Sequence, residues 1–277
     1  MRVASLPMYD ADPQAVDAWW AAISRALRAR GLPDVPDALA RPQELAAHWR
    51  DPRLVLSQTC GYPLVTGLAG DVQVVGAFRY TAPGCVGVEY RSHLVARLGD
   101  AESVEGFRGR AVAINSYDSH SGWNALRGLV APLSRRGAFF GEEVITGSHR
   151  RSLAAVQSGS ADIAAIDCVS LAALRRSEPE ALRGLQVVGS TALGPGLPLI
   201  TAKTTRPDEL EAIRAALRDA CADPTVSEVR EALFIDGFES LSVEAWALIE
   251  DVRRSVAPFR GCRQGHRRTA GTPCTGA

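Results

Sequence analysis

The chain has 277 residues, of which 46% are hydrophobic and 22% are charged, and its 31 basic side chains balance 31 acidic ones. This composition excludes wholesale disorder, and the zero net charge argues against a generic nucleic-acid-binding or polybasic membrane-binding protein. No run of about 18 apolar residues occurs, so the sequence predicts no membrane-spanning helix.

Short apolar strands alternate with amphipathic helices along the chain, which predicts an α/β protein. Residues 12–30 show the clearest helical pattern, because apolar side chains recur on one face and Gly31 ends the run. The other predicted helices are 121–134, 151–158 and most of 207–256. The predicted strands are 2–8, 53–57, 72–80, 86–98, 110–115, 144–146, 161–166, 185–190 and 197–202.

Two segments have the character of crossings between lobes. The stretch around 80–95 is long and extended, and 192–198 is rich in Gly and Pro. We therefore expect two α/β lobes, each a mostly parallel sheet flanked by helices, joined by two hinge strands with a ligand cleft between them. The predicted division is 1–88 plus 196–260 for lobe one, 89–195 for lobe two and 261–277 for a flexible basic tail.

The six cysteines form no C-x-x-C pair, and no histidine lies at zinc-ligand spacing from one. We therefore expect no metal site and no cofactor, and we interpret the cysteines as small buried residues rather than a disulfide framework. Free thiols favour the cytoplasm. Met1 and Arg2 lead straight into a predicted strand, so we expect either that the chain stays inside the cell or that an export signal has been removed.

The strongest local motif is the run NSYDSHSGW at 115–123, between a predicted strand and a predicted helix. Backbone N–H groups at a helix start are unpaired and carry partial positive charge. Ser119 and Ser121 add hydroxyl donors and Gly122 permits close approach of the backbone, so the motif predicts an anion site built without lysine or arginine. Alternatively, one of these serines only caps the helix.

Three further motifs place polar residues where the same cleft is expected. His149 stands at a strand-to-helix turn, and Asp167 lies at the carboxyl end of an apolar strand. Gln58 and Tyr62 belong to the run SQTCGYP at 57–63, and could offer an amide and a hydroxyl from the opposite wall. Each motif also has a purely structural interpretation. His149 is then an ordinary buried histidine, Asp167 caps a helix, and the run at 57–63 simply forms a turn.

Together and in this order, the motifs resemble the phosphate/phosphite/phosphonate substrate-binding proteins of ABC importers, over about residues 1–255. In that family a Ser-Thr-Ser-Gly run at a helix start holds the phosphorus oxyanion; here 119–122 match it, with His120 in place of the usual Thr. The family's Gly-Ser-His run is similar to 147–149, and its Asp-ending run is similar to 159–167. The resemblance also implies ligand contacts from Tyr9 and Tyr62.

The resemblance implies a monomeric type II periplasmic binding protein, not an enzyme, that carries a phosphonate, phosphite, phosphate or phosphate ester to an ABC permease. No catalytic residue, nucleic-acid partner or membrane span is expected. Two alternatives stay open: a cytoplasmic enzyme on the same fold, of menaquinone- or thiamine-pathway type, with histidines and Asp167 as acid–base groups, and a ligand-sensing domain. The candidate ligand contacts are Ser119, His120, Ser121, Gly122, His149, Asp167, Tyr62, Tyr9 and Gln58.

Overall fold

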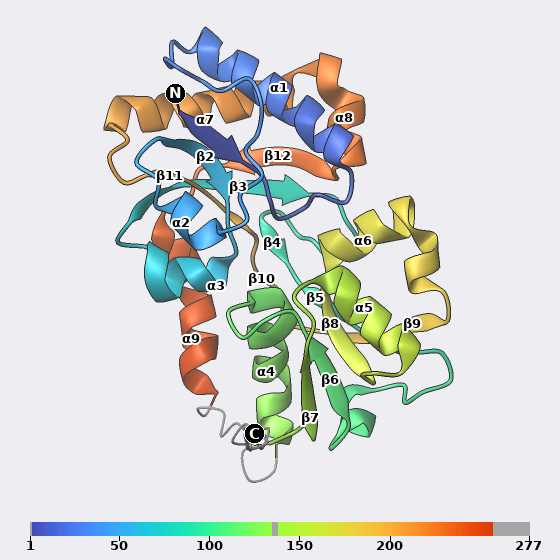
Figure 1. Cartoon of the computed structure of the whole chain (residues 1–277). Helices are drawn as coiled ribbons and strands as arrows, with labels where there is room; N and C mark the ends of the chain where they lie inside the picture. The colour runs from blue at the N-terminus through green and yellow to red at the C-terminus, as the bar shows by residue number, and fades with distance from the viewer. Residues whose placement is uncertain (1, 135–137, 257–277) are drawn as a thin grey trace, which may run out of the picture.

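The computed structural model describes residues 2–134 and 138–256, and this part of the chain forms two lobes (Figure 1). Its strands gather into two five-stranded sheets, one in each lobe, and a two-stranded ribbon. The middle of the chain, green to yellow in Figure 1, builds the lower lobe, and most of the rest builds the upper lobe. The predicted tail at 261–277 lies outside the described residues.

The first sheet has the strand order β1-β2-β11-β3-β12, and only β1 and β2 are parallel neighbours among its described strands. Its strands are β1 (Val3–Ser5), β2 (Leu54–Gln58), β3 (Val72–Tyr80), β11 (Pro198–Ala202) and β12 (Ile235–Glu239). The helices above it in Figure 1 are α1 (Pro13–Ala29), α7 (Pro207–Ala222) and α8 (Ser227–Ala232).

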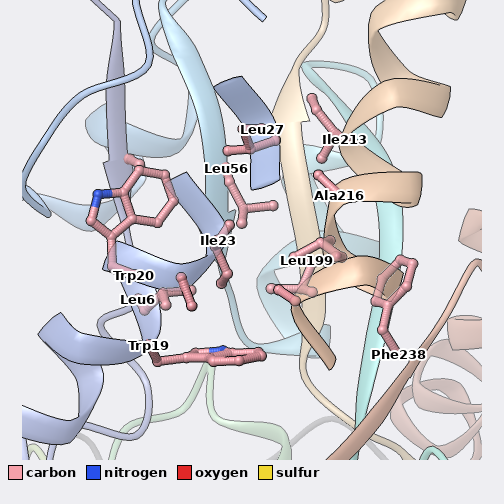
Figure 2. Packing of buried hydrophobic residues seen from close by; sticks show 14 of the residues in the cluster. Leu6, Trp19, Trp20, Ile23, Leu27, Leu56, Leu199, Ile213, Ala216 and Phe238 are labelled. Carbon is pink, nitrogen blue, oxygen red and sulfur yellow. The ribbon is translucent and has the colours of Figure 1, made fainter. Parts of the chain in front are cut away.

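Helix α1 shows why the core of this lobe forms where it does. The Asp12 carboxylate accepts the N–H of Ala15 at 3.0 Å, which caps the helix, and the following proline suits the first turn. Trp19, Ile23 and Leu27 then fall on one face and are almost fully buried between the helix and the sheet (Figure 2). Burial of each such side chain contributes about 1.5–3 kcal/mol.

The second sheet has the order β7-β6-β8-β5-β9. Its strands are β5 (Ser92–Arg97), β6 (Ala111–Ile114), β7 (Glu142–Ile145), β8 (Ile163–Asp167) and β9 (Leu185–Ser190). One buried cluster centres on Phe107 and Leu126, and another on Leu153 and Leu174, so this sheet has a core on each face. Its helices are α4 (Ala125–Val130), α5 (His149–Ser158) and α6 (Cys168–Ser177).

The lobes are joined by two crossings and by the last described helix. β4 (Glu89–Tyr90) pairs antiparallel with β10 (Gly194–Pro195). α9 (Ala247–Ser255) packs against both β10 and α4, and its Ile249 carbonyl accepts from the Asn124 amide at 3.2 Å. The shorter helical segments are α2 (Leu45–Trp49), α3 (Gly61–Pro63), η1 (Leu64–Leu68), η2 (Val104–Phe107), η3 (His120–Asn124), η4 (Ala131–Leu133), η5 (Pro179–Leu182), η6 (Pro224–Val226) and η7 (Val243–Trp246).

The expected two-lobed α/β architecture is confirmed, but the expectation of mostly parallel sheets is wrong. β5 and β11 each enter their sheet directly from a crossing, and each is antiparallel to both of its neighbours. Without a crossover helix there is nothing to bring such a strand round to the parallel direction. The prediction of a mostly helical segment over 207–256 also missed β12, which pairs with β3.

Candidate functional site

A cavity of about 590 Å³ lies between the lobes. The first lobe supplies residues from the loop after β1, together with the starts of α2 and α3 and the approach to β11. The second lobe supplies the carboxyl ends of β6, β7 and β8 and the first turns of the helices that follow. The polar and charged lining residues are Tyr9, Asp10, Asn115, Ser119, Ser121, Ser148, His149, Arg150, Asp167, Ser170 and Glu178.

The turn at 119–122 presents hydrogen-bond donors to this cavity. Ser119 caps η3, and its Oγ accepts the Gly122 N–H at 3.0 Å. The N–H of Ser121 has no protein acceptor among the described residues, as expected in the first turn of a helix. A Cβ on Gly122 would lie 2.8 Å from the Asn115 side chain, so a larger residue here would push that side chain aside. The turn therefore offers a free N–H beside two hydroxyls.

Ser121 and His149 form the central polar contact of the cavity. The Ser121 Oγ lies 3.0 Å from the His149 Nε2. Ser92 of β5 fixes the turn from behind by donating its hydroxyl to the Ser121 carbonyl at 2.9 Å. Burial lowers the pKa of His149 to about 4, so the imidazole is neutral at pH 7. A neutral imidazole beside a hydroxyl can donate or accept a hydrogen bond, depending on its tautomer.

Asp167 and Tyr9 connect the two lobes across the cavity. The Tyr9 hydroxyl, from the loop after β1, donates to the Asp167 Oδ2 at 2.8 Å. The other oxygen of Asp167 accepts the N–H groups of Val169 and Ser170 at 2.8 and 3.0 Å and so caps α6. Burial raises the pKa of Asp167 to about 6, although these donors oppose the shift. Burial, and then the neighbouring Asp167 charge, raise the pKa of Tyr9.

The structure does not bring the side chain of His120 into the cavity. Its ring packs beside Tyr90, its Nδ1 lies 3.2 Å from the Asn124 amide nitrogen, and Gly194 covers its Nε2. Burial lowers its pKa to about 4. Only the backbone of His120 belongs to the turn, where its N–H meets the Cys60 Sγ at 3.4 Å. The imidazole is thus a packing group near the crossings.

Gln58 and Tyr62 also lie away from the main cavity. Gln58 is 3% exposed and donates to the Tyr80 hydroxyl at 3.0 Å inside lobe one. It lines a separate small cavity of about 20 Å³, which it shares with Tyr9. Tyr62 packs against the apolar cluster around Trp246 instead. Neither residue lines the cavity between the lobes.

Sequence reasoning missed several residues of the cavity wall. Cys60 and Asn115 lie within the runs 57–63 and 115–123, but the sequence analysis does not predict either of them as a ligand contact. Arg150 follows His149 and forms an ion pair with Glu178, with its Nε 2.8 Å from the carboxylate, at the exposed rim. The position of Asn115 at the end of β6 was a usable signal. No sequence signal predicts the pairing of Arg150 with Glu178, because only the fold brings these two residues together.

The described residues hold no cluster of histidine, cysteine and acidic side chains that could bind a metal ion. Within 2–134 and 138–256, no helix is both long and apolar enough to span a membrane.

Comparison with solved structures identifies the fold. PhnD1 from Prochlorococcus marinus, solved with methylphosphonate, is 14% identical with a TM-score of 0.72, covering 91% of this chain and 97% of that one. A binding protein component of an ABC phosphonate transporter from Pseudomonas aeruginosa is 15% identical with a TM-score of 0.71, covering 91% and 86%. XAC2383 from Xanthomonas citri, solved with ATP, is 18% identical with a TM-score of 0.67, covering 92% and 99%. The fold is that of a type II periplasmic binding protein.

A family model identifies the protein family to which the chain belongs. The model for the periplasmic phosphonate substrate-binding protein of ABC transporters matches residues 84–246. The chain therefore belongs to this family, and it is a substrate-binding protein for a small phosphorus oxyanion. The family consists of transport components rather than enzymes, so the match does not support the enzyme alternative. A search of curated proteins found no match.

Proposed function

We propose that the cavity between the lobes holds the phosphorus oxyanion through Ser119, Ser121 and His149. The observation that carries the proposal is the 3.0 Å contact between Ser121 and His149 beside the free N–H of Ser121. An oxyanion in this position gains hydroxyl and N–H donors from a helix start without displacing a protein salt bridge. The lining cation, Arg150, is already paired with Glu178 at the rim.

Asp167 supplies the acceptor that selects among oxyanions. With a pKa of about 6 it is mostly ionised at pH 7, so it accepts hydrogen bonds and repels a bare oxygen. A phosphonate, phosphite or phosphate monoanion carries a proton that such an acceptor can receive, whereas sulfate does not. The apolar part of the wall, which includes Met8, Leu45 and Leu174, leaves room for an organic substituent.

We further propose that 1–88 plus 196–260 and 89–195 move as two bodies about the crossings. Separation of Tyr9 from Asp167 opens the cavity, and their contact closes it. In this proposal the protein acts as an exported monomer in the periplasm, where it delivers the ligand to an ABC permease.

Calorimetric titration with methylphosphonate, phosphite, phosphate, ATP and sulfate tests the ligand class. We expect binding of at least one phosphorus oxyanion and little or none of sulfate. The variant Ser121→Ala should weaken binding about ten- to hundredfold, because a hydrogen bond to a charged group is lost.

The matched control is Ser177→Ala, at the far end of α6, where the hydroxyl bonds only to the Ala173 carbonyl. This control should bind as the wild type does. If no phosphorus oxyanion binds, or if both variants bind like the wild type, the proposed site is wrong.

A further inference from the structure

Two cysteines that take no part in the proposed ligand contacts lie side by side next to the cavity. We propose that Cys85 and Cys168 form a disulfide when the protein meets an oxidant of the disulfide class, such as oxidised glutathione or the disulfide of an oxidoreductase. Their Sγ atoms are 3.4 Å apart. A disulfide bond is about 2.0 Å long, so the two sulfurs must approach by a little over an ångström to form it.

The backbone holds both thiols in this arrangement. Cys85 lies in the crossing between β3 and β4, and Cys168 is the first residue of α6. The N–H of Cys168 donates to the Arg91 carbonyl at 3.0 Å, which ties α6 to the crossing. Gly84 has a φ of +110°, and a Cβ there would lie 2.9 Å from the Cys168 Cβ. Glycine at this position therefore permits the close approach of the two cysteines.

The two thiols differ in solvent exposure and in acidity, and we therefore assign them different roles in the reaction. Cys85 is partly exposed, whereas Cys168 is buried. A hydrogen bond from the Cys85 thiol lowers the pKa of Cys168, and the first turn of α6 favours a thiolate there as well. Cys85 is thus the sulfur that an oxidant can reach, and Cys168 is the nucleophile that completes the bond.

The reaction then balances as an ordinary thiol–disulfide exchange. Cys85 passes its proton along the hydrogen bond to the Cys168 thiolate and attacks one sulfur of the oxidant, which breaks the oxidant's S–S bond and releases a thiolate. Cys168 gives the proton to that thiolate, attacks the Cys85 sulfur of the mixed disulfide and releases the second thiolate, which takes a proton from water. Two electrons pass from the two cysteine sulfurs to the oxidant.

The position of the bond connects it to ligand exchange. Cys168 directly follows Asp167, whose contact with Tyr9 bridges the lobes. The thiols belong to a buried cluster in which Tyr80 from lobe one packs with Val169 from lobe two. A disulfide would fix the start of α6 against the crossing and so slow the opening of the cavity. This consequence rests on the proposed function, whereas formation of the bond does not.

The test uses the full chain with oxidised glutathione at neutral pH, followed by thiol titration and tryptic peptide mapping. Trypsin places the two cysteines in separate peptides, 80–91 and 152–175, so a cross-link is identified directly. We expect these two peptides to be joined by a disulfide and the thiols of Cys85 and Cys168 to disappear together. Cys85→Ser should abolish the cross-link.

The control Cys221→Ser, a partly buried cysteine of α7, should leave the cross-link unchanged. The mapping on the wild type decides the matter even if a variant folds poorly. A glutathione adduct that persists on Cys85, or pairing of Cys85 with any other cysteine, overturns the proposal. Methylphosphonate binding is measured separately, so its absence would contradict the proposed function and leave the cross-link result standing.

Discussion

Replacing Asp167 with asparagine should make the protein more stable at pH 7. The carboxyl is 2% exposed, and its pKa is raised from 3.8 to about 6, mainly by burial. The folded state thus holds this proton more tightly than the unfolded chain does. The contribution of Asp167 to stability is therefore fully present below pH 3.8 and lost as the pH rises through 6.

The magnitude follows from the size of the shift. About two pKa units correspond to about 3 kcal/mol at pH 7. An asparagine at 167 retains one oxygen, which can accept the first N–H groups of α6, so the cap survives without the buried charge. Its NH2 group replaces the oxygen that faces Tyr9 and can donate to the Tyr9 hydroxyl oxygen. We expect Asp167→Asn to be up to about 3 kcal/mol more stable than the wild type at pH 7 and similar to it at pH 4.

Guanidinium denaturation followed by tryptophan fluorescence at pH 4 to 7.5 measures this difference. The comparison must be between the two proteins at each pH, because His120 and His149 act in the opposite direction. Their pKa values are lowered from 6.5 to about 4, so they add stability as the pH rises through the same range. A constant difference between wild type and variant across the range would refute the reasoning about Asp167.

Three further predictions concern the framework of the site. Leu56→Ala, at a fully buried position of β2, should cost about 2–5 kcal/mol of unfolding free energy, measured by denaturant titration, with little change in ligand affinity. Gly76→Ala should destabilise lobe one, because the new Cβ would lie 2.0 Å from the Glu239 carbonyl oxygen and disturb the pairing of β3 with β12. Amide hydrogen exchange should then become faster in both strands. The pKa of Asp162 is about 2, because the hydrogen bond from Arg110 at 2.8 Å outweighs the opposing effect of burial. Acid titration should therefore show about 2 kcal/mol of unfolding free energy lost as the pH falls from 3.8 through 2. The variant Asp162→Asn should not show that loss.

Local signals were sufficient where a residue and its partner lie close in sequence. The helix of 12–30 was predicted from its cap and its apolar period, and α1 occupies Pro13–Ala29. The sequence predicts Ser119 at a helix start and Asp167 at the end of a strand, with a helix cap as the alternative role of each, and in the structure both residues cap helices. These features depend on a few neighbouring residues, which a sequence shows directly.

The rest depends on partners that are distant in sequence. β12 was missed because a short strand with glycine at 237 has no clear period, and its partner β3 lies far back in the chain. His120 was expected in the oxyanion site from its place in the motif. The wide π-helical turn η3 directs the ring toward Tyr90 and Asn124. The motif alone does not predict this side-chain direction, because it does not show that the turn is π-helical.

The charge distribution explains why local donors matter at the proposed site. Six arginines and no acid lie after residue 252, so residues 1–252 carry 25 basic and 31 acidic side chains. The field of this acidic body opposes an approaching anion, although salt at physiological strength screens charges beyond about 8 Å. Attraction by net charge would also favour sulfate as much as a phosphonate. In the proposed site, neutral donors at Ser119 and Ser121 and the acceptor Asp167 instead favour a ligand whose oxygens and proton lie at matching positions. We therefore expect an acidic protein to select one oxyanion over others of equal charge.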